Sequence, residues 1–320
     1  MKDTILFGDC RETLKNLTNS SARMCVTSPP YYGLRDYGGE KNQIGQEESP
    51  EEYVKQMVEV FRLVRDVLTD DGTLWLNIGD SYYNYRSDGN YPKQTVSKTR
   101  QDLPQSTPVR GNKLKGLKSK DLIGIPWMLA FALRADGWYL RQDIIWHKPN
   151  PMPESVQDRC TKAHEYIFLL SKSKNYFYDN EAIKEPAKDW GTRDRTNGKY
   201  HNPGSGLAPH SGLTKSYATK NKRSVWSVTK KPYKGAHFAV FPPELIEPCI
   251  LAGSEVGDTI LDPFMGSGTS AMVAKSLGRY YTGCELHEEY GNLIQERIQD
   301  YHPVNEVAQE PTINILDLIQ

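Results

Sequence analysis

The chain of 320 residues has few cysteines, no long apolar run and no excess charge of either sign. Its five cysteines are scattered without a Cys-x-x-Cys pair, which argues against a zinc site or a disulfide framework. No apolar run reaches the length of about 18 residues that a membrane span needs, and no charged and then apolar leader opens the sequence. Forty Lys and Arg balance forty Asp and Glu, so a polyanionic partner must meet a local basic surface. We expect a soluble protein of the reduced, cytoplasmic type, without metal or membrane.

Short apolar runs alternate with amphipathic helical patterns along most of the chain. The apolar runs predict strands at residues 5–7, 24–26, 73–78, 139–146, 164–170, 259–262 and 280–285. Helical spacing predicts helices at residues 12–17, 49–68, 125–135 and 244–252, and another that begins near Thr269. We expect residues 70–72 to end the second helix, and residues 175–178 to pair with 164–170 as an antiparallel hairpin. Such alternation predicts an α/β fold with a doubly wound, mostly parallel sheet.

Two stretches, 82–120 and 186–234, show neither periodicity. The first contains many Lys and Arg but few acids, which predicts a basic insertion; a solvated loop is the alternative. The second is rich in Gly, Pro, Asn, Ser and basic residues with interleaved Tyr and Trp. Basic and aromatic loops fit a nucleic-acid surface, because cations meet phosphates and rings meet bases. An independent linker is the competing interpretation.

The strand predicted at 24–26 ends abruptly in Ser28, Pro29, Pro30 and Tyr31. The two prolines have no amide hydrogen, so the strand must stop, and their fixed φ angles aim the carbonyl groups as acceptors. Tyr31 offers a flat face beside those acceptors. This combination suits a planar ring that bears an amino group. An ordinary strand-ending turn is the alternative interpretation of the same residues.

The strand predicted at 259–262 ends in a second turn that holds an acid and two glycines. Its residues are Asp262, Pro263, Phe264, Gly266, Gly268 and Thr269. The glycines let the backbone pass close to a nucleotide-like cofactor, and Glu285 at the end of the next strand can accept hydrogen bonds from ribose hydroxyls. The turn lacks the Gly-x-x-x-x-Gly-Lys pattern of triphosphate sites, and Asp262 repels a pyrophosphate but favours a cation. An adenosine with a cationic amino acid portion fits, which indicates S-adenosylmethionine.

The two motifs resemble those of DNA amino-methyltransferases, which methylate cytosine N4 or adenine N6. Their order, Thr27 to Tyr31 early and Asp262 to Thr269 late, resembles the beta class, a circularly permuted form of the class I methyltransferase fold. The resemblance also includes Gly8 and Asp9, residues 237–242 and Glu285, and covers nearly the whole chain. It implies one catalytic domain from 1–185 and 235–300, a target-recognition region at 186–234 and a C-terminal tail at 301–320. The insertion at 82–120 matches no pattern of the family.

The resemblance implies direct methyl transfer from the sulfonium to the exocyclic amine, without a covalent enzyme intermediate. Ser28 Oγ and the Pro29 carbonyl would accept the hydrogens of the amine, which aligns its lone pair. The target base would be flipped out of the duplex and stacked on Tyr31. Four residues would share the cofactor: Asp9 its adenine amino group, Phe264 its adenosine, Glu285 its ribose and Asp262 its methionine ammonium.

The identity of the target base stays open between two amines. In the resembled family, Ser at the first motif position is more often associated with cytosine N4 and Asp with adenine N6, so Ser28 favours cytosine. A Ser hydroxyl can nevertheless accept from either amine. A catalytically silent nucleic-acid-binding protein and an RNA methyltransferase are further alternatives, although a silent protein would need neither motif intact. We expect double-stranded DNA as the partner and a monomer or a homodimer.

Overall fold

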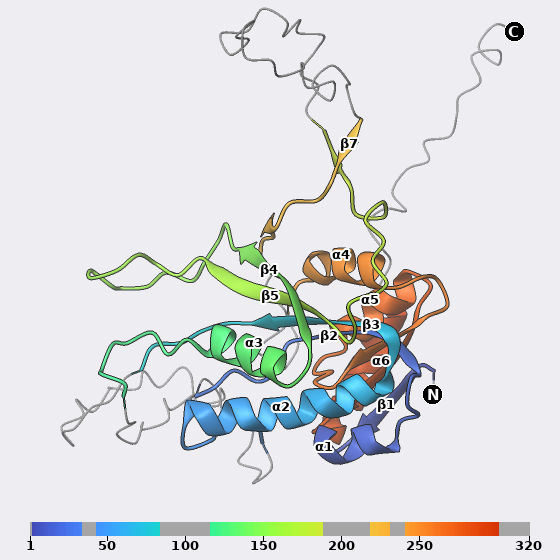
Figure 1. The fold of residues 1–320 in the computed structure, drawn as a ribbon, viewed down its shortest axis with the longest axis horizontal. Helices are drawn as coiled ribbons and strands as arrows, with labels where there is room; N and C mark the ends of the chain where they lie inside the picture. Colours follow the sequence, from blue (N-terminus) through green and yellow to red (C-terminus); the bar gives the residue numbers. More distant parts are fainter. Residues whose placement is uncertain (1, 34–42, 84–115, 188–217, 231–240, 301–320) are drawn as a thin grey trace, which may run out of the picture.

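A sheet of eight strands forms the centre of the computed structural model, which describes residues 2–33, 43–83, 116–187, 218–230 and 241–300 (Figure 1). Its strands are β1 (Thr4–Phe7), β2 (Ala22–Thr27), β3 (Leu68–Ile78), β4 (Tyr139–His147), β5 (His164–Ser171), β8 (Val225–Ser227), β9 (Thr259–Asp262) and β10 (Tyr280–Glu285). They lie in the order β1-β10-β9-β2-β3-β5-β4-β8. The five strands from β1 to β3 in this order are parallel, and β5 is antiparallel to both β3 and β4. The last two strands in sequence, β9 and β10, therefore lie between β1 and β2.

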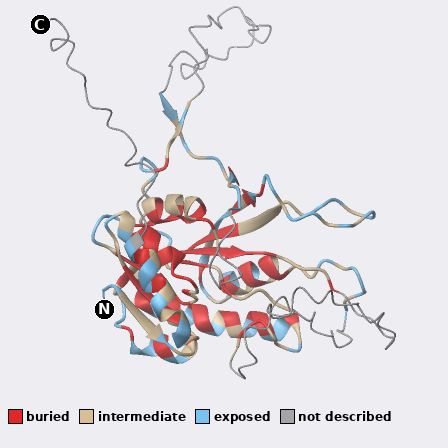
Figure 2. Cartoon of the chain, turned by 180° about the vertical axis from the view of Figure 1, so that it is seen from behind, coloured by how far each residue is buried: buried red, intermediate tan, exposed pale blue. Residues whose placement is uncertain are grey.

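Helices cover both faces of this sheet (Figure 1). One face holds α1 (Cys10–Thr13), α2 (Pro50–Val67) and α3 (Ile125–Ala135), and the other holds α4 (Pro243–Gly253), α5 (Thr269–Ser276) and α6 (Gly291–Asp300). Side chains alternate across β3, so Leu74 and Leu76 join the core under α2 whereas Trp75 joins the core under α4. Figure 2 shows the buried residues along the sheet and on the inner sides of the helices. The predicted doubly wound α/β fold is confirmed.

Helix α2 begins and ends within one residue of the predicted range 49–68. Ser49 Oγ accepts a hydrogen bond from Glu52 N at 3.2 Å, and Pro50 occupies the first turn. The predicted stop at residues 70–72 is wrong, because the chain turns extended at Leu68 and these residues lie within β3. A Cβ on Gly72 would lie 2.9 Å from the Thr69 carbonyl oxygen, so glycine permits the irregular register between β2 and β3 there.

Strand β5 is antiparallel to both of its neighbours, β3 and β4, and the predicted hairpin at residues 175–178 is wrong. Both edges of β5 are occupied, by β3 on one side and β4 on the other. Residues 175–178 form no strand; Phe177 N donates to the Asp71 carbonyl at 2.9 Å, and the Tyr178 ring stacks on Trp75 at 6.2 Å between centroids. The aromatic run therefore serves packing against the sheet rather than strand pairing.

The ends of the two basic stretches are described, but most of their residues are not. Tyr82 pairs with Leu122 at the base of the first stretch, whose residues 84–115 lie outside the described residues. In the second, β6 (Glu185–Pro186) pairs with β7 (Thr219–Lys220), and β8 adds to the main sheet beside β4. Residues 188–217, 231–240 and 301–320 also lie outside the described part. No helix among the described residues has both the length and the apolar character to cross a membrane.

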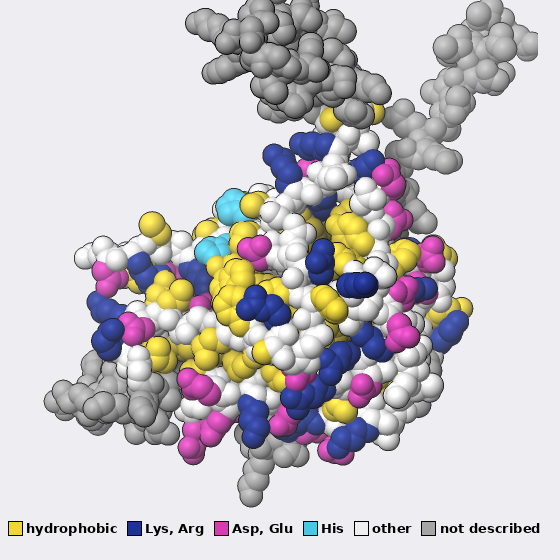
Figure 3. Space-filling model, viewed as in Figure 1, with side chains coloured by type: hydrophobic (Ala, Val, Ile, Leu, Met, Phe, Trp, Pro, Cys, Tyr) yellow, Lys and Arg dark blue, Asp and Glu magenta, His cyan; other side chains and the backbone are white. Residues whose placement is uncertain are grey.

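Charged residues of both signs are interspersed on the face that Figure 3 shows, without a large patch of one sign among the residues described there. This agrees with the balance of acidic and basic residues in the whole sequence.

Candidate active site

Both sequence motifs lie at one edge of the sheet. Parallel strands place their carboxyl ends at the same edge, so Ser28 after β2, Asp262 at the end of β9 and Glu285 at the end of β10 come together there. Asp9 follows β1 at this edge as well. Because β5 is antiparallel, its amino end lies at this edge and brings Glu165 beside the end of β3.

The turn after β2 is held from the side of α2. Pro29 is buried, and the Pro30 carbonyl accepts a hydrogen bond from the Tyr53 hydroxyl of α2 at 2.9 Å. Gly45 has a φ of +103° and packs so close that a Cβ there would lie 3.2 Å from the Tyr31 carbonyl oxygen. Helix α2 and the segment before it therefore fix the backbone of this turn, which the sequence predicts to bind the amine.

The Tyr31 side chain has its hydroxyl inside the protein. This hydroxyl donates to Glu165 Oε2 at 2.7 Å, lies 3.4 Å from Asn77 Oδ1 and is within hydrogen-bond reach of the Ser28 side chain. Burial and the neighbouring Glu165 charge raise the pKa of Tyr31, so its hydroxyl stays protonated and acts as a donor. A Cβ on Gly79 would lie 2.7 Å from Cε2 of the ring, so glycine makes the space that the ring occupies.

Asp262 connects the two motifs. Thr27 Oγ1, the last residue of β2, donates to Asp262 Oδ1 at 2.6 Å, and Phe264 N donates to the same oxygen at 3.0 Å. Ser270 Oγ donates to Oδ2 at 2.6 Å. The carboxylate is buried, and this burial raises the pKa of Asp262 to about 6 despite the three hydrogen bonds. The turn expected to bind the amine is thus tied directly to the turn expected to bind the cofactor.

Glu285 and two glycines shape the turn after β9. Glu285 Oε2 accepts from Gly266 N at 2.7 Å and its Oε1 accepts from His287 N at 3.0 Å. Burial raises the pKa of Glu285. Gly268 has a φ of +80°, and a Cβ there would lie 2.5 Å from a methyl carbon of Ile294. Pro263 and Thr269 are buried beside them, and Thr269 begins α5. The structure therefore brings together all the predicted cofactor residues of this turn.

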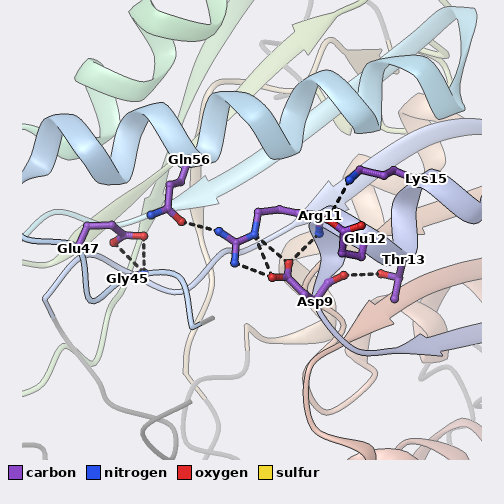
Figure 4. Close-up of polar contacts among 8 residues, drawn as sticks. All are labelled: Asp9, Arg11, Glu12, Thr13, Lys15, Gly45, Glu47 and Gln56. Atoms are coloured by element: carbon purple, nitrogen blue, oxygen red, sulfur yellow. Dashed lines mark hydrogen bonds and ion pairs between the residues drawn. The ribbon is translucent and has the colours of Figure 1, made fainter. Parts of the chain in front are cut away.

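Asp9 is held by a cation rather than left open (Figure 4). Its carboxylate accepts from the Arg11 backbone amide and Nε at 2.9 Å each, and pairs with the same guanidinium at 2.5 Å. Arg11 also donates to Gln56 Oε1 of α2 at 2.8 Å. Burial alone would raise the pKa of Asp9, but the Arg11 hydrogen bonds and charge bring it below its usual value. A ligand amino group would meet Asp9 next to Arg11.

Thr27, Arg11 and Glu165 are residues at this edge whose part the sequence motifs do not indicate. Thr27 belongs to the first motif, but its bond to Asp262 spans 235 positions of the chain. Arg11 looks like any basic residue in a first helical turn. Glu165 is an acid near the start of an apolar strand, a signal that indicates a site only once that strand is known to be antiparallel.

Comparison with known proteins identifies the family. The family model described as DNA methylase, for N6 and N4 methyltransferases, matches residues 22–296. The chain belongs to this DNA methylase family. A relative is the Type II methyltransferase M.SmaI of Serratia marcescens, 48% identical over 298 residues, which cover 92% of this chain and 90% of that protein.

Solved structures show the same fold as this DNA methylase. PvuII DNA methyltransferase (cytosine-N4-specific) superposes with a TM-score of 0.63 at 18% identity, covering 96% of this chain and 89% of that chain. TTHA0409 of Thermus thermophilus, complexed with S-adenosyl-L-methionine, has a TM-score of 0.57 at 24% identity and covers 92% of each chain. The predicted DNA amino-methyltransferase family, its class I fold and its cofactor S-adenosylmethionine are confirmed.

The residues of the second turn fit that cofactor. Asp262 and Glu285 are buried acids whose donors, given above, are hydroxyls and amides without charge. Such acids favour a cationic ligand, as S-adenosylmethionine is. Gly268 permits the positive φ of this turn and its close packing on Ile294, and the partly buried Phe264 ring lies in the same turn. The donor set and the shape of this turn agree with a cationic nucleoside.

Proposed function

We propose that this DNA methylase transfers a methyl group to N4 of cytosine in double-stranded DNA, at sites that it recognises by sequence. The observation that carries the proposal is the 2.6 Å hydrogen bond from Thr27 to Asp262. It fixes the amine-binding turn beside the cofactor turn, so a bound base and a bound methyl donor are neighbours. Proximity of this kind supplies a large part of the rate enhancement in a direct transfer.

The residues of the first turn align the attacking amine. Ser28 Oγ and the Pro29 carbonyl accept the two N–H groups of the amine, so its lone pair points away from the ring plane toward the cofactor turn. Tyr31 stacks on the flipped base, which offsets an unstacking cost of a few kcal/mol. When bound, S-adenosylmethionine would supply the electrophilic methyl group and leave as a neutral thioether, and the methylated amine, which gains the positive charge, would lose one proton to solvent. Asp262 and Glu285 bind its cationic and ribose parts.

Ser28 supports cytosine as the target base. A hydroxyl at this place is neutral and can both accept from the amine and donate to Tyr31, with which Ser28 already interacts. The PvuII enzyme, named as cytosine-N4-specific, shares the fold of this chain, and adenine N6 is the alternative amine. The stretch 186–234 would contact the recognition sequence, 1–185 and 235–300 would form the catalytic domain, and the reaction would take place in the cytoplasm.

The experiment is methyl transfer followed by nucleoside analysis. The purified chain is incubated with methyl-labelled S-adenosylmethionine and either duplex DNA from cells that lack this enzyme or total RNA. The polymers are then digested to nucleosides and separated by mass spectrometry, with heat-inactivated protein as control. We expect label in N4-methylcytosine from DNA. Label in N6-methyladenine contradicts the proposed base, and label in RNA alone contradicts the proposed polymer.

A further inference from the structure

A buried ion pair lies behind the tyrosine of the amine-binding turn. Lys148, which follows the last residue of β4, is 8% exposed and pairs through Nζ with Glu165 Oε1. The Lys148 ammonium also lies 4.4 Å from the centroid of the Trp146 ring. Burial lowers the pKa of Lys148, although the Glu165 charge opposes this shift. The pair therefore occupies a place where charges are costly.

The second oxygen of Glu165 is used by the active-site turn. Oε2 accepts from the Tyr31 hydroxyl at 2.7 Å, and Asn77 Nδ2 lies 3.5 Å from the same oxygen. Asn77 is itself fixed, because Nδ2 donates to the Tyr166 carbonyl at 3.1 Å. Hydrogen bonds to an ionised acceptor are stronger than neutral ones, so the Tyr31 hydroxyl has a firm anchor.

The pair is difficult to explain by stability alone. Replacing a buried ion pair with apolar residues of similar volume is often neutral or stabilising. Lys148 and Glu165 nevertheless stand at the edge of the sheet where Ser28 and Tyr31 lie, and Glu165 bonds the end of the side chain that is to stack on the base. The ring packs directly against Gly79, where a Cβ would lie 2.7 Å from its Cε2, and the hydroxyl bond to Glu165 holds its other end.

We propose that Glu165, held by its ion pair with Lys148, is a positioning residue that fixes the ring of Tyr31 for stacking of the flipped base. The inference rests on the proposed role of Tyr31 in base stacking. Lys148 has a second effect, because it neutralises the carboxylate. An unpaired acid at this place would compete with Asp262 for the cation of the methyl donor, whereas a neutralised pair orients the tyrosine without attracting the cofactor.

A double-mutant cycle through the tyrosine hydroxyl tests this inference. Tyr31→Phe removes only the hydroxyl, and the paired change Lys148→Met with Glu165→Met removes both charges without leaving either buried alone. We expect each to lower kcat for DNA methylation by about 10- to 100-fold, as small misplacements of a reacting group do. The kcat of the triple variant should fall no further than the kcat of the more impaired of these two variants, because both changes act through one hydrogen bond.

The readouts separate positioning from general damage. Rates are expressed per S-adenosylmethionine-binding site measured by calorimetry, and the dissociation constant for that cofactor should stay unchanged in all variants. The matched control is Asp258→Asn, which breaks a partly buried ion pair with Arg23 at the opposite edge of the sheet and should leave kcat unchanged. The inference is overturned if the variant with both Lys148→Met and Glu165→Met turns over at the wild-type rate. It is also overturned if the decrease in kcat of this variant multiplies in full with that of Tyr31→Phe. Wild-type protein that methylates no DNA would instead contradict the proposed function.

Discussion

The two turns at the active edge of the sheet hold their acids in opposite ways. Beside the turn after β2, Glu165 is paired with the cation Lys148 and bonds the Tyr31 hydroxyl. In the turn after β9, Asp262 is held by two hydroxyls and an amide, all uncharged, and burial raises its pKa to about 6. A neutralised acid can orient a ring, whereas an acid held only by neutral donors is ready to receive a positive ligand.

This difference agrees with the separate tasks proposed for the two turns. The methyl donor carries positive charge, so it gains most where buried acids have neutral donors. The base is a neutral, flat ring, so it gains most from an oriented aromatic face and from carbonyl and hydroxyl acceptors. Variants in each turn should therefore give different phenotypes.

The largest expected effect is loss of turnover on Tyr31→Ala. Without the ring, the flipped base loses a stacking contact worth about 1–3 kcal/mol and its orientation as well, so kcat/KM for DNA should fall by at least about 10²-fold. Binding of S-adenosylmethionine should persist, because the turn after β9 is untouched. Labelled methyl transfer and calorimetric titration of the cofactor measure the two properties. Loss of cofactor affinity in this variant would contradict the separation of tasks.

Phe264→Ala is expected to show the reverse phenotype. Removal of this partly buried ring should weaken S-adenosylmethionine binding by about 10- to 100-fold, the range of one aromatic stacking contact. At saturating cofactor, kcat should recover most of the wild-type value, since Tyr31 and Ser28 are unchanged. Initial rates over a wide cofactor range give both constants. A fall in kcat that saturating cofactor does not restore would show that the two turns are not separable.

The sequence predicted the parallel part of this edge well, and for a clear reason. Ser28, Asp262 and Glu285 each end a short apolar strand, and parallel strands must bring such residues to the same edge. Glu165 escapes this rule, because it stands near the start of its strand. Glu165 reaches the edge because β5 runs antiparallel to both of its neighbours, β3 and β4. Strand direction is set by the whole sheet and cannot be seen in residues 164–171 alone.

The predicted role of Asp9 shows a second limit of sequence motifs. Its place after β1 is correct, but the motif does not reveal that Arg11 folds back onto its carboxylate. Similarly, residues 175–178 have the aromatic composition of a strand but find both edges of β5 taken. In each case a contact with a neighbouring part of the fold determines the conformation or the binding state of the residue, and the local sequence pattern does not reveal that contact.

Asp262→Asn should exchange cofactor affinity for stability. The pKa of Asp262 is about 6 in the folded protein and 3.8 in the unfolded chain. Its protonation therefore stabilises the fold fully below pH 3.8, and this contribution is lost as the pH rises through about 6. At neutral pH the ionised group then costs the fold about 3 kcal/mol, which the variant recovers. S-adenosylmethionine binding should weaken roughly tenfold at pH 8, and the difference from wild type should vanish below pH 6.

Thermal unfolding and cofactor titration across this pH range measure both properties. The melting temperature of the variant should exceed that of the wild type by an amount that grows between about pH 4 and pH 6 and then stays constant. A variant that is less stable than the wild type at pH 8 would show that the hydrogen bonds of Asp262 outweigh its burial. Cofactor affinity that is independent of pH in the wild type would remove the charge of Asp262 from the explanation.

The smallest effect, and the sharpest test of how the turns are joined, is expected for Thr27→Val. This change keeps the shape but removes the donor to Asp262 Oδ1, so the free energy of unfolding should fall by about 1–2 kcal/mol. The ionised carboxylate also loses a hydrogen bond, so the pKa of Asp262 should move higher and the pH midpoint of S-adenosylmethionine binding should rise with it. Thr73→Val is the control, because its buried hydroxyl accepts from Trp75 Nε1 at 3.1 Å and does not contact Asp262. Thr73→Val should lower stability without moving that midpoint, since of these two hydroxyls it is that of Thr27 that bonds Asp262. Equal midpoints in the two variants would contradict the proposed connection between the turns.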